Sequence, residues 1–145
     1  MPAISDQDVF DRYPNVLLNY DNIEHFRGLL EHRLLINRCQ DSGHWIYPHR
    51  PLCPECWSTN VVPTEVAGKG FVYMYMVLYQ GRAVETGLEY PHVKAAIELA
   101  EQPGLRYLAP LVNCEPDQAR DGMPVQLTWV ELDGAPAAAF EPVTG

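Results

Sequence analysis

Three cysteines in a short segment are the residues whose type and spacing point most directly to chemistry. Cys53-Pro54-Glu55-Cys56 is a complete Cys-x-x-Cys turn, and Cys39 precedes it in the same segment. Two such turns facing each other place four thiolates around a tetrahedral zinc ion, each about 2.3 Å from it. In a reducing compartment this clustering favours a metal site over disulfides. The pattern therefore predicts a small zinc ribbon.

The first turn of this ribbon lacks one thiol. It runs Cys39-Gln40-Asp41-Ser42-Gly43, so Ser42 stands where a second cysteine is expected. A neutral hydroxyl is a weak zinc ligand, whereas His44 can supply an imidazole if the loop widens, and His49 is a more distant candidate. Structural zinc contributes on the order of 10 kcal/mol, so losing one ligand weakens such a site without abolishing it. We predict a structural zinc ion held by Cys39, Cys53, Cys56 and His44.

Two other interpretations of the ribbon stay open. In the first, the ribbon has lost its metal and is held together by packing of Trp45, Ile46, Tyr47, Leu52 and Trp57. Alternatively, three protein ligands and an open position form a catalytic site, although three thiolates make zinc a poor Lewis acid. We expect no catalytic residues in this chain and expect Cys114, far in sequence from any histidine, to be a small buried hydrophobe.

The elements that position these residues can be predicted from periodicity. Residues 1–19 have no sustained period and are predicted to be an extended arm. Apolar residues at helical spacing predict a helix over Ile23–His32, followed by short strands Leu34–Arg38 and Trp45–Tyr47 within a ribbon region over 20–66. This region has too few aliphatic residues for a core of its own.

Residues 67–145 have the pattern of a small barrel. Five strand-like segments separated by glycine and proline contain no long helix, which is typical of a five-stranded closed barrel. The segments are Phe71–Gln80, Val93–Ala100, Leu105–Asn113, Met123–Leu132 and Ala137–Pro142. The predicted fold class is mainly β: an N-terminal helix and a zinc-ribbon-like segment followed by an OB-fold barrel.

The first barrel segment is apolar on both faces, so one face is predicted to contact a second surface. Alternation places Tyr73, Tyr75 and Tyr79 together on one side. Arg82, Tyr90 and His92 flank the long loop that follows, and loops of that length often serve recognition. We predict partner or substrate contacts at Tyr73, Tyr75, Tyr79, Arg82, Tyr90 and His92.

Charge narrows the possible partners. The formal net charge is −9, which opposes binding to phosphate backbones and anionic membranes. There is no leader-like segment or membrane-length apolar run, and no dinucleotide, P-loop or zincin motif. We expect a cytoplasmic protein that binds neither nucleic acid nor membrane. A single-strand binder using the tyrosines stays open as an alternative.

From about Tyr20 to Val143 the chain resembles the acyl-CoA-associated family known as domain-of-unknown-function family 35. The resemblance rests on Arg38-Cys39 with Gly43, on Tyr47 to Cys56, on Gly68 to Tyr73, on Tyr90-Pro91, on Asp121 to Val125 and on Phe140-Glu141-Pro142. It implies a rubredoxin-like zinc ribbon preceding an OB-fold. The chain departs from the family pattern at Ser42.

The resemblance also implies a function. Family members resemble partners of thiolases, thiolase-like aldolases and MaoC-type hydratases, including enzymes that shorten steroid side chains. The implied function is an accessory subunit, non-catalytic alone, that binds and stabilises a thiolase-like aldolase performing retro-aldol cleavage of a β-hydroxyacyl-CoA. A MaoC-type hydratase as partner and a free acyl-CoA-binding module are alternatives.

Overall fold

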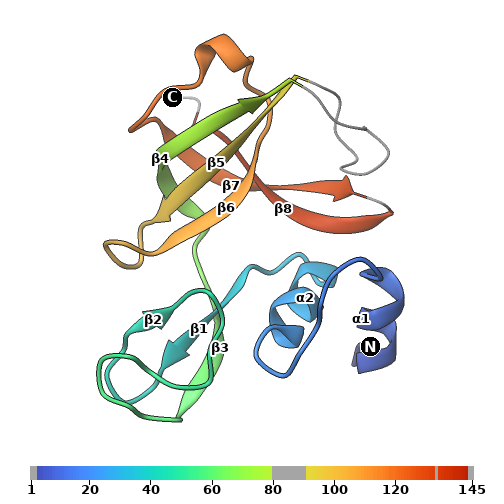
Figure 1. Ribbon diagram of the computed structural model, residues 1–145, viewed down its shortest axis with the longest axis vertical. Helices are drawn as coiled ribbons and strands as arrows, with labels where there is room; N and C mark the ends of the chain where they lie inside the picture. Colours follow the sequence, from blue (N-terminus) through green and yellow to red (C-terminus); the bar gives the residue numbers. More distant parts are fainter. Residues whose placement is uncertain (1–2, 80–90, 133, 144–145) are drawn as a thin grey trace. The chain divides into compact units, whose positions relative to one another are not determined.

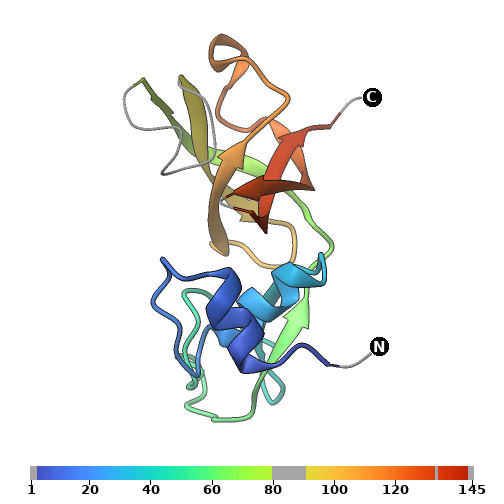
Figure 2. The ribbon, with the colours of Figure 1, turned by 90° about the vertical axis from the view of Figure 1, so that its right-hand side faces the viewer.

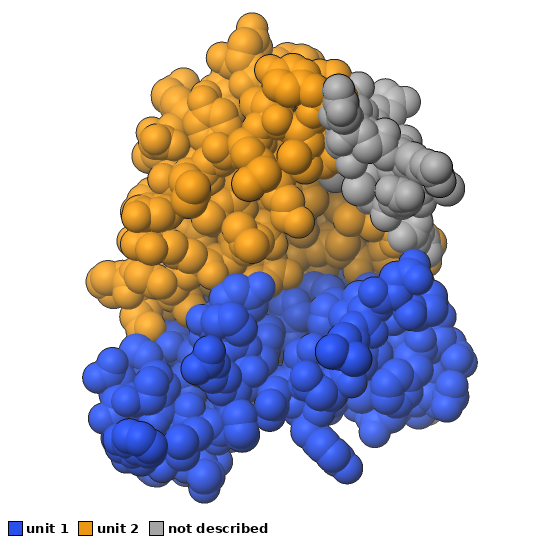
Figure 3. All heavy atoms as spheres, viewed as in Figure 1, with its two compact units in different colours: residues 1–66 blue, residues 67–145 orange. Residues whose placement is uncertain are grey.

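The computed structural model describes residues 3–79, 91–132 and 134–143. The chain divides into two compact units, residues 1–66 and 67–145 (Figure 3). Of the predicted contact residues, Arg82 and Tyr90 lie outside the described residues. The mainly β fold class, with N-terminal helical structure and a ribbon ahead of a closed five-stranded barrel, is confirmed.

Two short helices open the first unit, α1 (Asp6–Arg12) and α2 (Ile23–Leu30), and they lie side by side in both views (Figures 1 and 2). The predicted extended arm is therefore wrong for residues 6–12. Ser5 and Asp8 form a reciprocal capping box, each side chain accepting from the other's backbone N–H. No helix in the described part of the chain has the length and apolar character of a membrane span.

Packing against α2 explains why so short a helix as α1 forms. Val9 is fully buried, and the rings of Tyr13 and Phe26 lie 5.1 Å apart. Arg27 of α2 donates to Asp6 of α1 and to the backbone carbonyl of Ile4. Tertiary contacts thus stabilise a helix that is too short to be stable alone.

The ribbon is a three-stranded antiparallel sheet in the order β2-β1-β3. Its strands are β1 (Leu35–Cys39), β2 (Trp45–Ile46) and β3 (Val61–Glu65). The sequence did not predict β3, because Pro63 lies in the middle of it. Proline is tolerated there because β3 is an edge strand, where one side of the backbone has no ladder partner.

The second unit is a closed barrel in the order β4-β5-β6-β8-β7 (Figure 1). Its strands are β4 (Lys69–Leu78), β5 (His92–Leu99), β6 (Arg106–Leu111), β7 (Pro124–Leu132) and β8 (Ala135–Pro142), with a 3-10 turn η1 (Pro116–Gln118) between β6 and β7. All pairs are antiparallel except β6 with β8. Large side chains fill the interior, among them Val72, Ile97, Val125 and Phe140.

A β-bulge in β4 changes which side chains share a face. The register with β5 shifts between Val72 and Met74, so Val72 and Tyr75 both pair with inward-facing residues while Met74 and Met76 point outward. Strict alternation placed Tyr73 and Tyr75 on one face, and that prediction is wrong. An extra residue at a bulge reverses the alternation on one side of it.

Candidate metal centre and barrel surface

The two turns of the ribbon have the same backbone geometry. In the first, Gly43 N–H donates to Cys39 O at 2.9 Å and Cys39 N–H donates to His44 O at 2.8 Å. In the second, Trp57 N–H donates to Cys53 O at 2.9 Å and Cys53 N–H donates to Ser58 O at 2.9 Å.

The backbone after each turn is also alike. Gly43 has a φ of +78° and Trp57 a φ of +65°, so both occupy the left-handed region. Counting along each turn, Ser42 is therefore the structural equivalent of Cys56. Both of these residues are exposed, whereas the leading cysteines of the two turns are fully buried.

The three predicted cysteine ligands converge. The sulfur atoms of Cys39, Cys53 and Cys56 all lie within 4.8 Å of one another, and the Cys39 and Cys56 sulfurs are 3.6 Å apart. The Ser42 Oγ lies 3.5 Å from the Cys53 sulfur, and the Ser42 N–H donates to the Cys39 sulfur at 3.4 Å. Three soft thiol donors at this spacing fit a structural metal ion.

The predicted histidine ligand is not in this group. Across the described residues, the only metal-type cluster consists of the three cysteines, without a ring nitrogen of His44. The turn does not widen, because the backbone N–H of His44 donates to Ser42 Oγ at 3.3 Å and its carbonyl accepts from Cys39. Ser42, dismissed as a weak ligand from sequence, is the residue that faces the thiols.

The surroundings of Cys39 and Cys53 favour the metal-binding thiolate form, whereas the pKa of Cys56 is raised, with its hydrogen bonds to those two thiols acting in that direction. Hydrogen bonds from the Ser42 hydroxyl and backbone lower the pKa of Cys39 to about 6. The Ser42 hydroxyl likewise lowers the pKa of Cys53. A lowered thiol pKa raises the fraction of thiolate at neutral pH, and the thiolate is the species that binds metal.

His49, the more distant candidate, belongs to a different cluster. It packs against His25 with ring centroids 4.7 Å apart, and both rings contact the carbonyl of Leu35, at 3.0 Å from His25 Nδ1 and 3.4 Å from His49 Nε2. Burial lowers the pKa of both, to about 4 for His25. These histidines are part of the packing between α2 and β1.

The outer face of β4 to β6 carries an apolar surface. We call Tyr73, Met74, Met76 and Leu108 the outer patch; their exposed fractions are 43%, 54%, 52% and 58%. Met74 and Leu108 flank Ala96 across three neighbouring strands. Sequence alternation did not find Leu108, because β6 was predicted without a register. Tyr79, beyond the end of β4, is 72% exposed, and Tyr75 is half-buried on the inward side.

Two charged side chains, Arg106 and Glu98, lie beside Tyr73 at one side of the outer patch. The Arg106 guanidinium lies 3.6 Å from the centre of the Tyr73 ring and pairs with Glu98 at 3.3 Å. The cation therefore occupies the face of the ring that base stacking would need.

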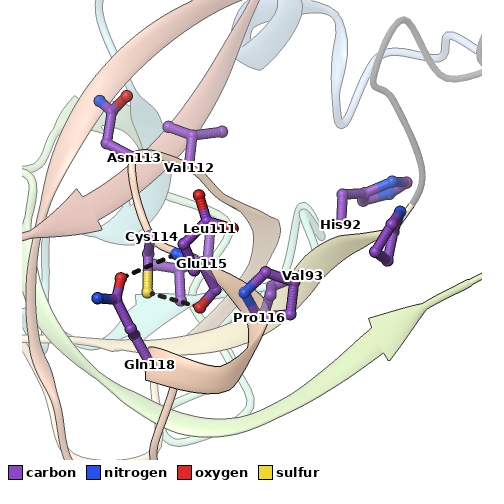
Figure 4. Close-up of a pocket in the computed structure, with 10 residues that line it drawn as sticks. His92, Val93, Leu111, Val112, Asn113, Cys114, Glu115, Pro116 and Gln118 are labelled. Carbon is purple, nitrogen blue, oxygen red and sulfur yellow. Dashed lines mark hydrogen bonds between the residues drawn. The ribbon is translucent and has the colours of Figure 1, made fainter.

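A pocket of about 370 Å³ lies where β5 begins and β6 ends (Figure 4). It is lined by His92, Val93, Leu111, Val112, Asn113, Cys114, Glu115, Pro116 and Gln118, together with Pro91. The predicted contact residue His92 thus lies at a pocket. Cys114, expected to be buried, is partly exposed there; it lies beyond the end of β6 at Leu111 and follows Asn113, whose φ is +54°.

The pocket does not have the features of a nucleophilic site. Burial first, and then the Glu115 carboxylate, raise the pKa of Cys114, which opposes thiolate formation. The Cys114 sulfur contacts the carbonyl of Glu115 at 3.5 Å, and Gln118 accepts from the Glu115 N–H at 3.1 Å (Figure 4).

Fold and site together define a class: a rubredoxin-like ribbon followed by a five-stranded OB barrel. Residues 26–62 match the family described as ChsH2, rubredoxin-like zinc ribbon domain, and residues 63–136 match ChsH2, C-terminal OB-fold domain. The chain belongs to this family, also known as DUF35, and the resemblance drawn from its motifs is confirmed.

Curated relatives carry two kinds of name. The chain is 38% identical to a probable enoyl-CoA hydratase alpha subunit of Thermomonospora curvata, over 83% of this chain and 36% of that protein. It is 30% identical to the 3-oxo-4,17-pregnadiene-20-carboxyl-CoA hydratase alpha subunit of Mycobacterium tuberculosis, over 79% of this chain and 35% of that protein. It is 35% identical to a DUF35 domain-containing scaffold protein of Pyrococcus furiosus, over 71% of each chain. The chain thus spans about a third of the two hydratase subunits.

Among solved structures, a chain of an Ltp2-ChsH2(DUF35) aldolase superposes with a TM-score of 0.81 at 34% identity, covering 90% of this chain and 100% of that chain. A DUF35 protein of unknown function from Sulfolobus solfataricus superposes with a TM-score of 0.58 at 17% identity, covering 94% and 96%. The second likeness bears on the fold alone.

Proposed function

We propose that this chain is an accessory subunit that binds and stabilises a thiolase-like acyl-CoA aldolase. The partner would cleave the bond between the α and β carbons of a β-hydroxyacyl-CoA, and we propose a steroid side chain as the acyl group. Catalysis belongs to the partner, and this chain contributes a docking surface. The likeness to a complete chain of an Ltp2-ChsH2(DUF35) aldolase supports this proposal most directly.

The outer patch is the surface that we propose for docking. Its four large apolar side chains are each 43–58% exposed and come from two strands of a rigid barrel. Methionine side chains adapt to a partner's shape, and contiguous exposed apolar groups mark interaction sites. The Arg106–Glu98 pair at its edge supplies the polar rim that interfaces usually have.

A hydratase partner is the second candidate. It is supported by the printed names of the relatives from Thermomonospora curvata and Mycobacterium tuberculosis, both hydratase alpha subunits. The second name describes a pregnadiene carboxyl-CoA hydratase, which also supports a steroid acyl group. In both relatives the matching segment is about a third of a longer protein.

Binding of single-stranded nucleic acid has less support. The net charge is −9, so the counterion release that dominates such binding is missing. Arg106 covers the face of Tyr73, and Tyr75 lies on the inward side of the bulge.

The test is co-expression of the full chain with a thiolase-like protein and, separately, with a MaoC-type hydratase from the same genome. A tag on this chain should recover the thiolase-like protein with it in a fixed ratio, and the eluate should cleave a β-hydroxyacyl-CoA. Recovery of a MaoC-type hydratase instead would favour the second candidate. If the thiolase-like protein is stable and fully active alone and never co-elutes, the accessory role is wrong.

Variants locate the docking surface. The double variant Met74→Asp and Leu108→Asp should weaken the complex at least tenfold, about 1.4 kcal/mol, because charge replaces apolar contact. Leu17→Asp is the matched control, since Leu17 is 87% exposed but lies in the first unit. Equal loss of binding in both, or in neither, would rule out the outer patch as the interface.

A further inference from the structure

The ribbon contains two turns of the same geometry but only three thiols. In each turn the residue after the second ligand position donates its N–H to the leading cysteine's carbonyl, at 2.9 Å in both. Ser42 therefore occupies the position that Cys56 occupies in its own turn. The backbone places its side chain toward the cluster, independently of whether that side chain is a thiol or a hydroxyl.

Two distances among the four donors agree with those of a tetrahedral zinc site. Sulfurs about 2.3 Å from a tetrahedral ion lie about 3.8 Å apart, and an oxygen about 2.1 Å from that ion lies about 3.6 Å from each sulfur. The Cys39 and Cys56 sulfurs are 3.6 Å apart, and the Ser42 Oγ lies 3.5 Å from the Cys53 sulfur. The hydroxyl thus lies at ligand spacing from the Cys53 sulfur, beside a group of three sulfurs that are all within 4.8 Å of one another.

We propose that the Ser42 hydroxyl is the fourth ligand of a structural zinc ion held by Cys39, Cys53 and Cys56. Its backbone N–H is already committed to the Cys39 sulfur at 3.4 Å, which fixes the orientation of the residue. His44 is excluded from the ligand set because its backbone closes the turn and its ring is outside the cluster.

This ligand set predicts a weaker and more exchangeable site than four thiolates give. Three thiolates and a neutral hydroxyl carry one negative charge less around the ion, so the attraction for a divalent cation is smaller. The hydroxyl is also a harder, poorer donor for zinc than sulfur. An altered outer-shell contact alone changes metal affinity about 10–100-fold, so an added thiolate should do at least as much.

The experiment is a Co²⁺ titration of the full-length chain, with Zn²⁺ affinity measured by competition with a chromophoric chelator. One Co²⁺ per chain should give tetrahedral d–d bands and a sulfur-to-cobalt charge-transfer band with the intensity of three thiolates. Ser42→Cys should raise that intensity by about a third and tighten Zn²⁺ binding at least about tenfold. His44→Ala, the matched control from the same turn, should leave both unchanged.

A second measurement separates serine from water as the fourth ligand. Thiocyanate displaces bound water but not a ligand tethered to the chain, so it should leave the wild-type Co²⁺ spectrum unchanged and alter that of Ser42→Ala. A wild-type spectrum that responds to thiocyanate as Ser42→Ala does would overturn the proposal. So would a His44→Ala spectrum that changes, or the failure of the wild-type chain to bind Co²⁺ or Zn²⁺.

Discussion

The ribbon of the first unit and the barrel of the second bury very different side chains. The buried cluster at the two ribbon turns consists of Cys39, Ile46 and Cys53, with Val61 at its margin. The barrel encloses Phe140, Ile97 and Val72 with no exposed surface. Two of the three buried residues of this cluster are therefore metal-ligand candidates rather than hydrocarbon, although the ribbon strands also bury Leu35, Ile36 and Trp45 outside it.

This contrast separates two sources of stability. A closed five-stranded sheet pairs every strand edge and buries enough apolar surface to be stable by packing. The ribbon has a strand of only two residues, β2, and open sheet edges. We infer that the ribbon depends on its metal, whereas the barrel depends on its core.

Metal removal should have the largest effect. Structural zinc contributes on the order of 10 kcal/mol to small ribbons, so a chelator should unfold the ribbon strands and leave the barrel folded. Hydrogen exchange should show loss of protection in β1 and β3 while the amides of β5 are unchanged. Equal protection of β1 before and after chelation would favour the packing-only interpretation of the ribbon.

Truncation of the barrel core should have the next largest effect. Phe140→Ala should lower the free energy of unfolding of the barrel by about 3–5 kcal/mol, because Phe140 is 0% exposed and its loss leaves a cavity. Urea denaturation measures this change, with Leu108→Ala as the control, expected within about 0.5 kcal/mol. Loss of the ribbon's Co²⁺ spectrum in folded Phe140→Ala protein would contradict the separation of the two regions.

Acid should act on the first unit through His25. Its pKa is about 4 in the folded chain and about 6.5 when unfolded, so the unfolded state binds more protons between these values. Stability is therefore complete above about pH 6.5 and falls toward pH 4, by on the order of 3 kcal/mol. The pKa of the neighbouring His49, which faces Asp21, is also lowered. Protonation of His49 therefore also reduces the stability of the fold as the pH falls.

Denaturation curves from pH 7.5 to 4.5 check this prediction. His25→Gln keeps a donor for Leu35 O but does not titrate. It should therefore reduce the difference in the free energy of unfolding between pH 7.5 and pH 4.5. If the free energy of unfolding depends on pH identically in His25→Gln and the wild type, the acid sensitivity belongs to other groups.

The smallest expected effect lies at the equivalent ends of the two turns. Trp57 has a left-handed φ of +65° and is 76% exposed, so Trp57→Gly should stabilise the ribbon by about 1 kcal/mol. Gly43→Ala, at φ +78°, should destabilise it by about the same amount. Thermal unfolding of the metal-loaded chain measures both; destabilisation by Trp57→Gly would mean that the indole stabilises the fold through contacts.

Sequence reasoning predicted the elements whose signals are local. The spacing Cys53-Pro54-Glu55-Cys56 predicted a metal turn. The periodicity around Phe26 predicted a helix over Ile23–His32, which the structure has as α2 at Ile23–Leu30. The capping pair Ser5 and Asp8 is a local signal for α1 within the segment predicted to be an extended arm. β3 could not be predicted because Pro63 is acceptable only on an edge strand, and edge position is a property of the assembled sheet.

The sequence by itself determined that a ribbon region precedes a barrel, and it determined the three thiols and the missing fourth. These follow from composition and from spacings of three or four residues, which local backbone geometry fixes. Only the tertiary structure decided that Ser42 rather than His44 faces the thiols, because that depends on how the first turn closes. It also decided which side chains form the outer patch, since one bulge at Tyr73 reverses the alternation of β4.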